Sequence, residues 1–168
     1  MSTVVMPRED VHRLAEECSD SGDAFRAVAS RLLRDQKRLT NFLKRNMPEL
    51  DQETREVVLY MFAVCVRVFE QYGGRLKKVS GSEIDSAAER VRSLAAEIMP
   101  FDDGFPERVR GVEWRAQPHL LDEALWALFE REDREEGELD VPPDQAGMIF
   151  LLLWVAVESL NSHWTPPS

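Results

Sequence analysis

Hydrophobic side chains recur every three or four residues along most of the chain, which is the spacing of one face of an α-helix. In the second such stretch, Phe25, Val28, Leu32 and Leu39 fall on one face. Proline, glycine and capping residues divide the pattern into separate helices. The sequence therefore predicts six helices, covering about residues 8–18, 23–45, 51–72, 82–99, 118–129 and 142–163.

The third and the sixth predicted helices are apolar on nearly every side. Every position of 57–66 is apolar, and 146–157 is nearly so. The branched side chains of 57–66 would also suit a strand, but the predicted helix around them is too long for an ordinary strand. The run 146–157 is too short for a bilayer span of roughly 20 residues. We expect both to be core helices that the other four enclose.

These elements predict an all-α fold, a compact bundle of about six helices in one domain covering 1–168. The ends, 1–7 and 165–168, are expected to be flexible. A faint repeat runs through the chain, because Glu49-Leu50-Asp51 leads into the third helix and Glu138-Leu139-Asp140 leads into the sixth. Two related helical hairpins would explain it, although any amphipathic hairpin has a similar pattern.

The charge balance narrows the classes of partner. With 31 acidic and 21 basic residues, the formal net charge is −10 at pH 7. This charge opposes nucleic-acid phosphates and anionic membranes, so neither is an expected partner. Cys18 and Cys65 lie far apart in partly apolar helical segments, which predicts reduced core thiols. With no export signal in the first ten residues, a cytoplasmic location is expected.

Two histidine–glutamate pairs are the candidate metal ligands. His12 and Glu16, like His119 and Glu123, are four residues apart and share a helix face. Di-iron bundles use a Glu-x-x-His order that neither pair has. The acidic run 130–140 could in principle hold Mg²⁺ for a nucleotide, but it crowds one helix end and a loop, as a solvated surface run does. No metal, cofactor or catalytic residue is therefore predicted.

The second predicted helix, 23–45, carries most of its charge as basic residues. A basic stripe of this kind can contact phosphates, but no DNA-reading motif accompanies it. A solvated outer face rich in ion pairs is the favoured interpretation. The residues are Arg26, Arg31, Arg34, Lys37, Arg38, Lys44 and Arg45.

One basic and one acidic residue interrupt the two apolar helices. Arg67 lies in the third and Glu158 in the sixth. If the two helices pack together, these side chains could meet as a partly buried ion pair that fixes their register. The alternative is that Glu158 is a functional buried carboxylate.

The segment 100–117 is the longest without clear helical periodicity. Long irregular connections in compact domains are often functional, and aromatic residues with arginine are typical of binding hot spots. The alternative is a lid whose rings fill a gap between helices. The predicted contact residues are Phe101, Phe105, Arg108, Arg110, Trp114 and Arg115.

The sequence carries no catalytic motif, so the favoured function is a non-enzymatic cytosolic interaction or regulatory protein. A homodimer is expected because the four other helices would leave part of the apolar pair uncovered. Two alternatives stay open. One is a metal- or nucleotide-dependent enzyme with a site between helices, and the other is a nucleic-acid accessory protein that uses helix 23–45.

Overall fold

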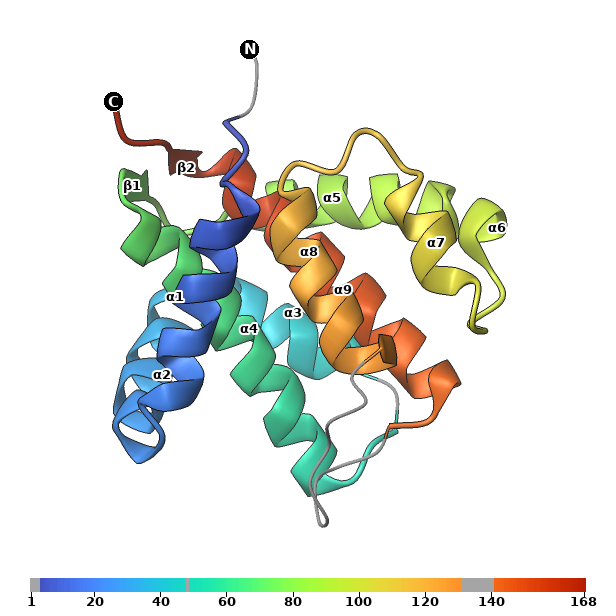
Figure 1. Ribbon diagram of the computed structural model, residues 1–168, viewed down its shortest axis with the longest axis horizontal. Coiled ribbons are helices and arrows are strands. Elements are labelled where there is room, and N and C mark those ends of the chain that lie inside the picture. Colours follow the sequence, from blue (N-terminus) through green and yellow to red (C-terminus); the bar gives the residue numbers. More distant parts are fainter. Residues whose placement is uncertain (1–3, 48, 131–140) are drawn as a thin grey trace.

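The structure is a computed structural model that describes residues 4–47, 49–130 and 141–168. The described part is nearly all helix, which confirms the predicted all-α class (Figure 1). The elements are α1 (Arg8–Asp20), α2 (Asp23–Asp35), α3 (Lys37–Asn46), α4 (Gln52–Tyr72), β1 (Arg75–Leu76), α5 (Gly81–Ser93), α6 (Ala95–Ile98), α7 (Phe105–Arg110), α8 (Pro118–Leu125), the π-helical turn η1 (Trp126–Glu130), α9 (Pro143–Ser162) and β2 (Trp164–Thr165).

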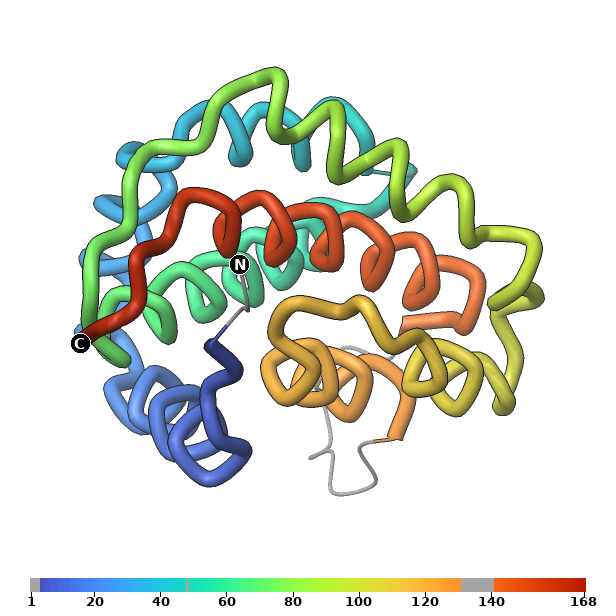
Figure 2. The backbone as a smooth tube through the Cα atoms, turned by 90° about the horizontal axis from the view of Figure 1, so that it is seen from above, coloured from blue at the N-terminus to red at the C-terminus, as the bar shows by residue number. Residues whose placement is uncertain are grey.

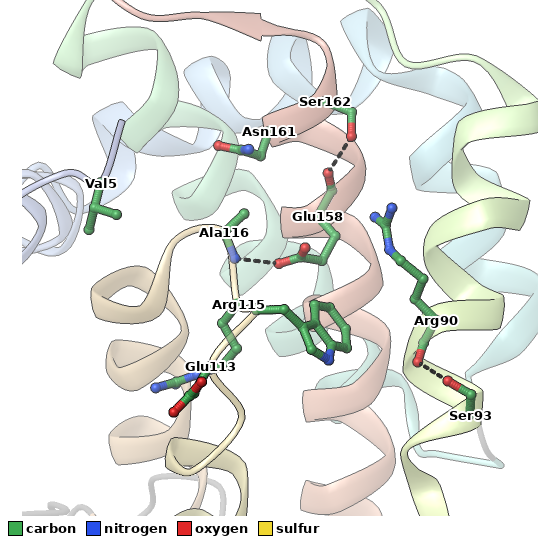
Figure 3. Close-up of a pocket in the computed structure, with 10 residues that line it drawn as sticks. Val5, Arg90, Ser93, Glu113, Arg115, Ala116, Glu158, Asn161 and Ser162 are labelled. Carbon is green, nitrogen blue, oxygen red and sulfur yellow. Dashed lines mark hydrogen bonds between the residues drawn. The ribbon is translucent and has the colours of Figure 1, made fainter. Parts of the chain in front are cut away.

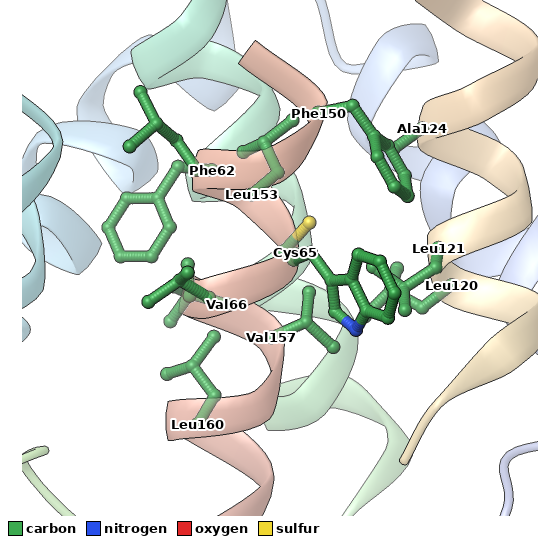
Figure 4. Packing of buried hydrophobic residues seen from close by; sticks show 14 of the residues in the cluster. Phe62, Cys65, Val66, Leu120, Leu121, Ala124, Phe150, Leu153, Val157 and Leu160 are labelled. Carbon is green, nitrogen blue, oxygen red and sulfur yellow. The ribbon is translucent and has the colours of Figure 1, made fainter. Parts of the chain in front are cut away.

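The apolar helices α4 and α9 run side by side through the centre (Figure 2). α5 and α8 pack along α9, while α1 and α2 pack on α4. Thirteen residues of α9 are buried, from Ala146 to Leu160. Figure 4 shows Phe62 and Val66 beside Leu153 and Val157 in this core. Burying each such side chain contributes about 1.5–3 kcal/mol, so this pair of helices carries much of the stability.

The predicted helix 23–45 is two helices, because the chain breaks at Gln36. The side chain of Gln36 is 5 % exposed. Its Nε2 donates to Lys77 O at 3.1 Å and its Oε1 accepts from Val79 N at 3.0 Å. A tertiary contact with the segment between β1 and α5 therefore fixes a non-helical residue that periodicity alone could not reveal.

Two other predicted helices differ at their ends. The helix expected over 82–99 divides at Leu94, where the backbone tightens to a bond between Leu94 N and Val91 O. α8 continues as the wider turn η1. Each change lies within the last two turns of the predicted helix, where helical geometry is least strongly enforced.

The described ends of the chain are anchored. Met6 is fully buried, and its N–H donates to Gln117 Oε1 at 3.0 Å. Near the other end, β2 pairs antiparallel with β1, which the sequence analysis did not predict. Gly74 has φ +82°, and a Cβ there would lie 2.1 Å from Thr165 O, so only glycine fits.

Among the described residues, α9 alone is long and apolar enough to cross a membrane by length and composition. The whole helix α9 meets both criteria, whereas the apolar run 146–157 alone is too short to span a bilayer. In the fold, 72 % of the apolar window of α9 is buried by other parts of the chain. Burial of this kind is typical of a core helix of a globular domain.

Candidate functional site

The predicted contact segment 100–117 does not form one surface, because its aromatic residues near α7 enter the core. Phe105 is fully buried and packs edge-on against Phe101 and Phe150. Phe101 covers Gly147, where a Cβ would lie 2.1 Å from the ring. These two phenylalanines thus fill a gap between helices, as the alternative interpretation of this segment expected.

Two of the predicted arginines hold the chain together. Arg108 donates from Nε to Ile98 O at 2.9 Å and from Nη2 to Pro100 O at 2.6 Å. It therefore satisfies carbonyls at the end of α6. Arg110 pairs with Glu130, which ties α7 to η1. Both arginines therefore bind groups of the fold itself rather than presenting their charges to a partner.

The other two predicted residues, Trp114 and Arg115, line an open pocket of about 560 Å³ beside the C-terminal end of α9. We call it the Glu158 pocket (Figure 3). Arg90 lines it from α5. Trp114, Arg115 and Ala116 line it from the segment 111–117, and Glu158 and Asn161 line it from α9.

Trp114 is a fixed aromatic surface at this pocket. Its ring stacks on that of Trp154 with centroids 5.2 Å apart and planes at 23°. Trp154 is fully buried, whereas Trp114 is 39 % exposed. A ring supported on one face and open on the other presents a rigid apolar area to solvent.

Arg115 fixes the segment that carries Trp114. Its guanidinium pairs with Asp122 at 3.0 Å and also donates to Val112 O and Arg110 O. Its side chain is only 7 % exposed. These contacts hold the segment in place before any partner arrives, which lowers the entropic cost of binding.

Glu158 is the buried carboxylate of the pocket. It is 5 % exposed, and its Oε2 accepts a hydrogen bond from Ala116 N at 2.9 Å. Burial raises the pKa of Glu158, while the Ala116 N–H and the nearby positive charge of Arg90 act to lower this pKa. Figure 3 shows the carboxylate between the 111–117 segment and Arg90.

The ion pair predicted between Arg67 and Glu158 is wrong. Arg67 pairs with Glu70, one turn further along α4. Glu70 also accepts from Arg31 of α2 at 2.9 Å, and both arginines lower the pKa of Glu70. Arg67 thus lies on the face of α4 towards α2, whereas Glu158 lies on the face of α9 towards the segment 111–117.

Two charged side chains at the Glu158 pocket lie outside the ion pairs of the described residues, although the charge of Arg90 acts on the nearby Glu158. Among the residues that the structure describes, the side chains of Arg90 and Glu113 form no ion pair. Both look like ordinary exposed charges in the sequence, so nothing in its pattern singled them out. The place of Arg90 beside Glu158 is set by the packing of α5 against α9.

A second pocket, of about 480 Å³, lies between α1 and α8. Its charges are largely paired with one another. His12 bonds Glu123 at 2.8 Å and Glu16 at 3.0 Å, and Arg8 pairs with Asp122 at 3.3 Å. The Nδ1 of His119, which also lines this pocket, is buried with no partner in the described part of the chain. The arrangement is that of a contact between two helices.

Both candidate histidines thus lie at the second pocket, but they do not form a metal site there. Within residues 4–47, 49–130 and 141–168, no three side chains of the types His, Cys, Asp and Glu gather as metal ligands would. Of the acidic run 130–140, residues 131–140 lie outside the described residues. Cys18 and Cys65 are buried free thiols, as predicted.

The basic stripe of α2 and α3 is partly paired. Arg31 bonds Glu70 and Asp35. The remaining basic residues, except Arg26, are exposed and make no ion pair with any described residue; they are Arg34, Lys37, Arg38, Lys44 and Arg45.

No family model, curated protein or solved structure matches this chain.

Proposed function

We propose that the protein is a non-enzymatic cytosolic interaction protein that binds an extended segment of a partner protein in the Glu158 pocket. Trp114 is the observation that carries this proposal. It is exposed at the pocket, yet it is held by stacking on Trp154 and by the anchored segment around Arg115. Rigid tryptophans next to arginine dominate the binding energy of many protein interfaces.

The backbone at the edge of the pocket supports an extended partner. Gln117 bonds the carbonyl of Val4 and the N–H of Met6. In extended backbone, the polar groups of the residue between them point the other way. Val5 lines the Glu158 pocket, and its N–H and carbonyl have no hydrogen-bond partner in the described chain. A free edge of this kind can pair with the main chain of an added strand.

The test compares two tryptophans of similar exposure. Trp114 is 39 % exposed at the Glu158 pocket, and Trp126 is 44 % exposed at the second pocket. Proteins retained from cell extract by the full chain would be quantified for wild type, Trp114→Ala and Trp126→Ala. We expect at least one retained protein to bind wild type and Trp126→Ala equally and to lose about tenfold or more in affinity for Trp114→Ala.

The retained protein would then be purified, and hydrogen exchange of the complex measured. Protection of residues 112–117 is the expected result. Binding that Trp114→Ala leaves unchanged, or that Trp126→Ala weakens equally, would contradict the proposal.

A nucleic-acid accessory role is the second candidate, and the unpaired basic residues of α2 and α3 favour it. Contacts between such residues and phosphates release counterions, so binding would weaken steeply with salt. The double variant Arg34→Glu, Lys37→Glu should abolish binding to a duplex measured at low salt. If binding persists in that variant, this role is excluded.

A further inference from the structure

The free charges at the Glu158 pocket are mostly negative. Arg115 pairs with Asp122 at 3.0 Å, a carboxylate that Arg8 and Arg110 share. Among the described lining residues, Arg90 is the positive side chain that forms no ion pair, and Glu113 and Glu158 are the negative ones. The whole chain, with its formal charge of −10, has the same sign.

We propose that the partner segment inserts a lysine or arginine side chain into this pocket, with its apolar stem on Trp114 and its cationic head against Glu158. This inference rests on the proposed function and specifies the partner's chemistry. Carboxylates that fold without a salt-bridge partner are available to such a head group.

The positions of Trp114 and Glu158 fit one long basic side chain. Trp154, on which Trp114 stacks, is four residues before Glu158 and therefore shares its face of α9. A cation over an indole face gains from the ring quadrupole, most of all when it is partly removed from water. Glu113, next to Trp114 in the sequence, also lines the pocket and carries a second carboxylate.

Arg90 opposes a cation in this pocket, and this opposition provides a diagnostic test. If the bound side chain is basic, removing the charge of Arg90 strengthens binding. If the bound side chain is acidic, Arg90 is its partner and the same change weakens binding. The sign of the effect distinguishes the two chemistries.

The experiment uses capped tripeptides with a central arginine, glutamate or glutamine, added to the ¹⁵N-labelled full chain. The four tryptophans give four indole N–H signals, which single Trp→Phe variants assign. We expect the arginine peptide to shift the Trp114 and Trp154 signals and to leave those of Trp126 and Trp164 in place. The glutamine peptide, which matches the shape without charge, is expected to bind about tenfold more weakly.

Variants then identify the carboxylates. Glu158→Gln should weaken binding of the arginine peptide about tenfold, and Arg90→Gln should strengthen it about twofold to threefold. Glu113→Gln, at an exposed position, should weaken it about twofold to threefold while leaving the fold unaffected. This variant tests whether a carboxylate of the pocket attracts the basic side chain, without changing a buried residue.

Preferential binding of the glutamate peptide, weakened by Arg90→Gln, would overturn the inference while leaving the Trp114-dependent partner of the proposed function intact. Absence of any shift of Trp114 with all three peptides would overturn it as well. Loss of the proposed function has a different signature, which is a partner indifferent to Trp114→Ala.

Discussion

The carboxylate of Glu158 accepts one hydrogen bond, from Ala116 N, in surroundings that exclude most water. Burial raises the pKa of Glu158 in the folded protein above its value in the unfolded chain. A group of this kind contributes stability that is fully present below its unfolded pKa and is lost as the pH rises through its folded pKa. Above its unfolded pKa, Glu158 therefore opposes folding, which is typical of a residue kept for function.

The variant Glu158→Gln tests whether the buried carboxylate lowers the stability of the fold. Its amide oxygen can still accept from Ala116 N, but it carries no charge, so we expect greater stability than wild type at pH 7. The difference should shrink as the pH falls towards 4, because the wild-type carboxyl becomes neutral as well. Urea unfolding at a series of pH values measures it, with the exposed Glu113→Gln as control. A variant less stable than wild type at every pH would refute this account.

At the scale of elements, α9 meets the aromatic cluster near α7 through Gly147. A Cβ on Gly147 would lie 2.1 Å from Cδ1 of Phe101, which itself packs on buried Phe105. The ring cannot withdraw without opening that cluster. The glycine therefore sets how closely the 100–105 segment approaches α9.

Gly147→Ala should lower the free energy of unfolding by about 1–3 kcal/mol, the range for overpacking a filled core. Gly111→Ala is the matched control, because the Cβ there would meet nothing closer than 3.4 Å and its φ is −75°. It should be neutral or slightly stabilising. Thermal or denaturant unfolding of both variants checks the prediction, and equal stabilities would contradict it.

The contact between α1 and α8 depends on pH through His12. Its hydrogen bond and charge interaction with Glu123, helped by Glu16, raise the pKa of His12. The resulting stability is fully present below the unfolded pKa of histidine, about 6.5, and is lost as the pH rises through the higher folded pKa. Because the side chain is 54 % exposed, solvent screens the pair.

His12→Gln should therefore destabilise the protein by less than about 1 kcal/mol near pH 5.5 and have almost no effect near pH 9. Unfolding curves at both pH values, with Glu123→Gln as the reciprocal variant, measure this. An effect that is larger at the higher pH would be inconsistent with a charged His12.

The predicted pair of hairpins gains a structural parallel. Gln36 directly precedes α3, which is followed by α4, and Gln117 directly precedes α8, which is followed by η1 and α9. Each amide bonds the carbonyl of one residue and the N–H of the residue two further on in a non-helical segment, 77–79 for Gln36 and 4–6 for Gln117. Duplication of a helical hairpin stays a prediction, and these two equivalent glutamine contacts support it.

For the whole molecule, the homodimer also stays a prediction, but its original reason is weaker. The apolar faces of α9 are covered within one chain. Val4, Val5 and Trp114, each about 40 % exposed or more, are the exposed apolar residues nearest the Glu158 pocket. A dimer contact would be expected there rather than on α9.

Light scattering of the purified chain over a wide range of concentration decides the oligomeric state. If a dimer forms, its mass should be twice that of the chain, and Trp114→Ala should weaken the association about tenfold or more. Trp126→Ala is again the control. A strict monomer at high concentration removes the dimer and leaves the pocket free for another partner.

The sequence by itself determined the helical class, the two apolar core helices and their main stops, because periodicity, prolines and glycines act within a few residues of chain. It also named Trp114 and Arg115 among the candidate contact residues of the segment 100–117, and Glu158 as a candidate buried carboxylate. Only the tertiary structure decided that Phe101 and Phe105 are core, that Arg31 of α2 binds Glu70 beside Arg67, and that Gln36 breaks a helix. It alone placed Arg90 beside Glu158. Those outcomes depend on contacts between residues distant in sequence, and no local pattern encodes which distant groups will meet.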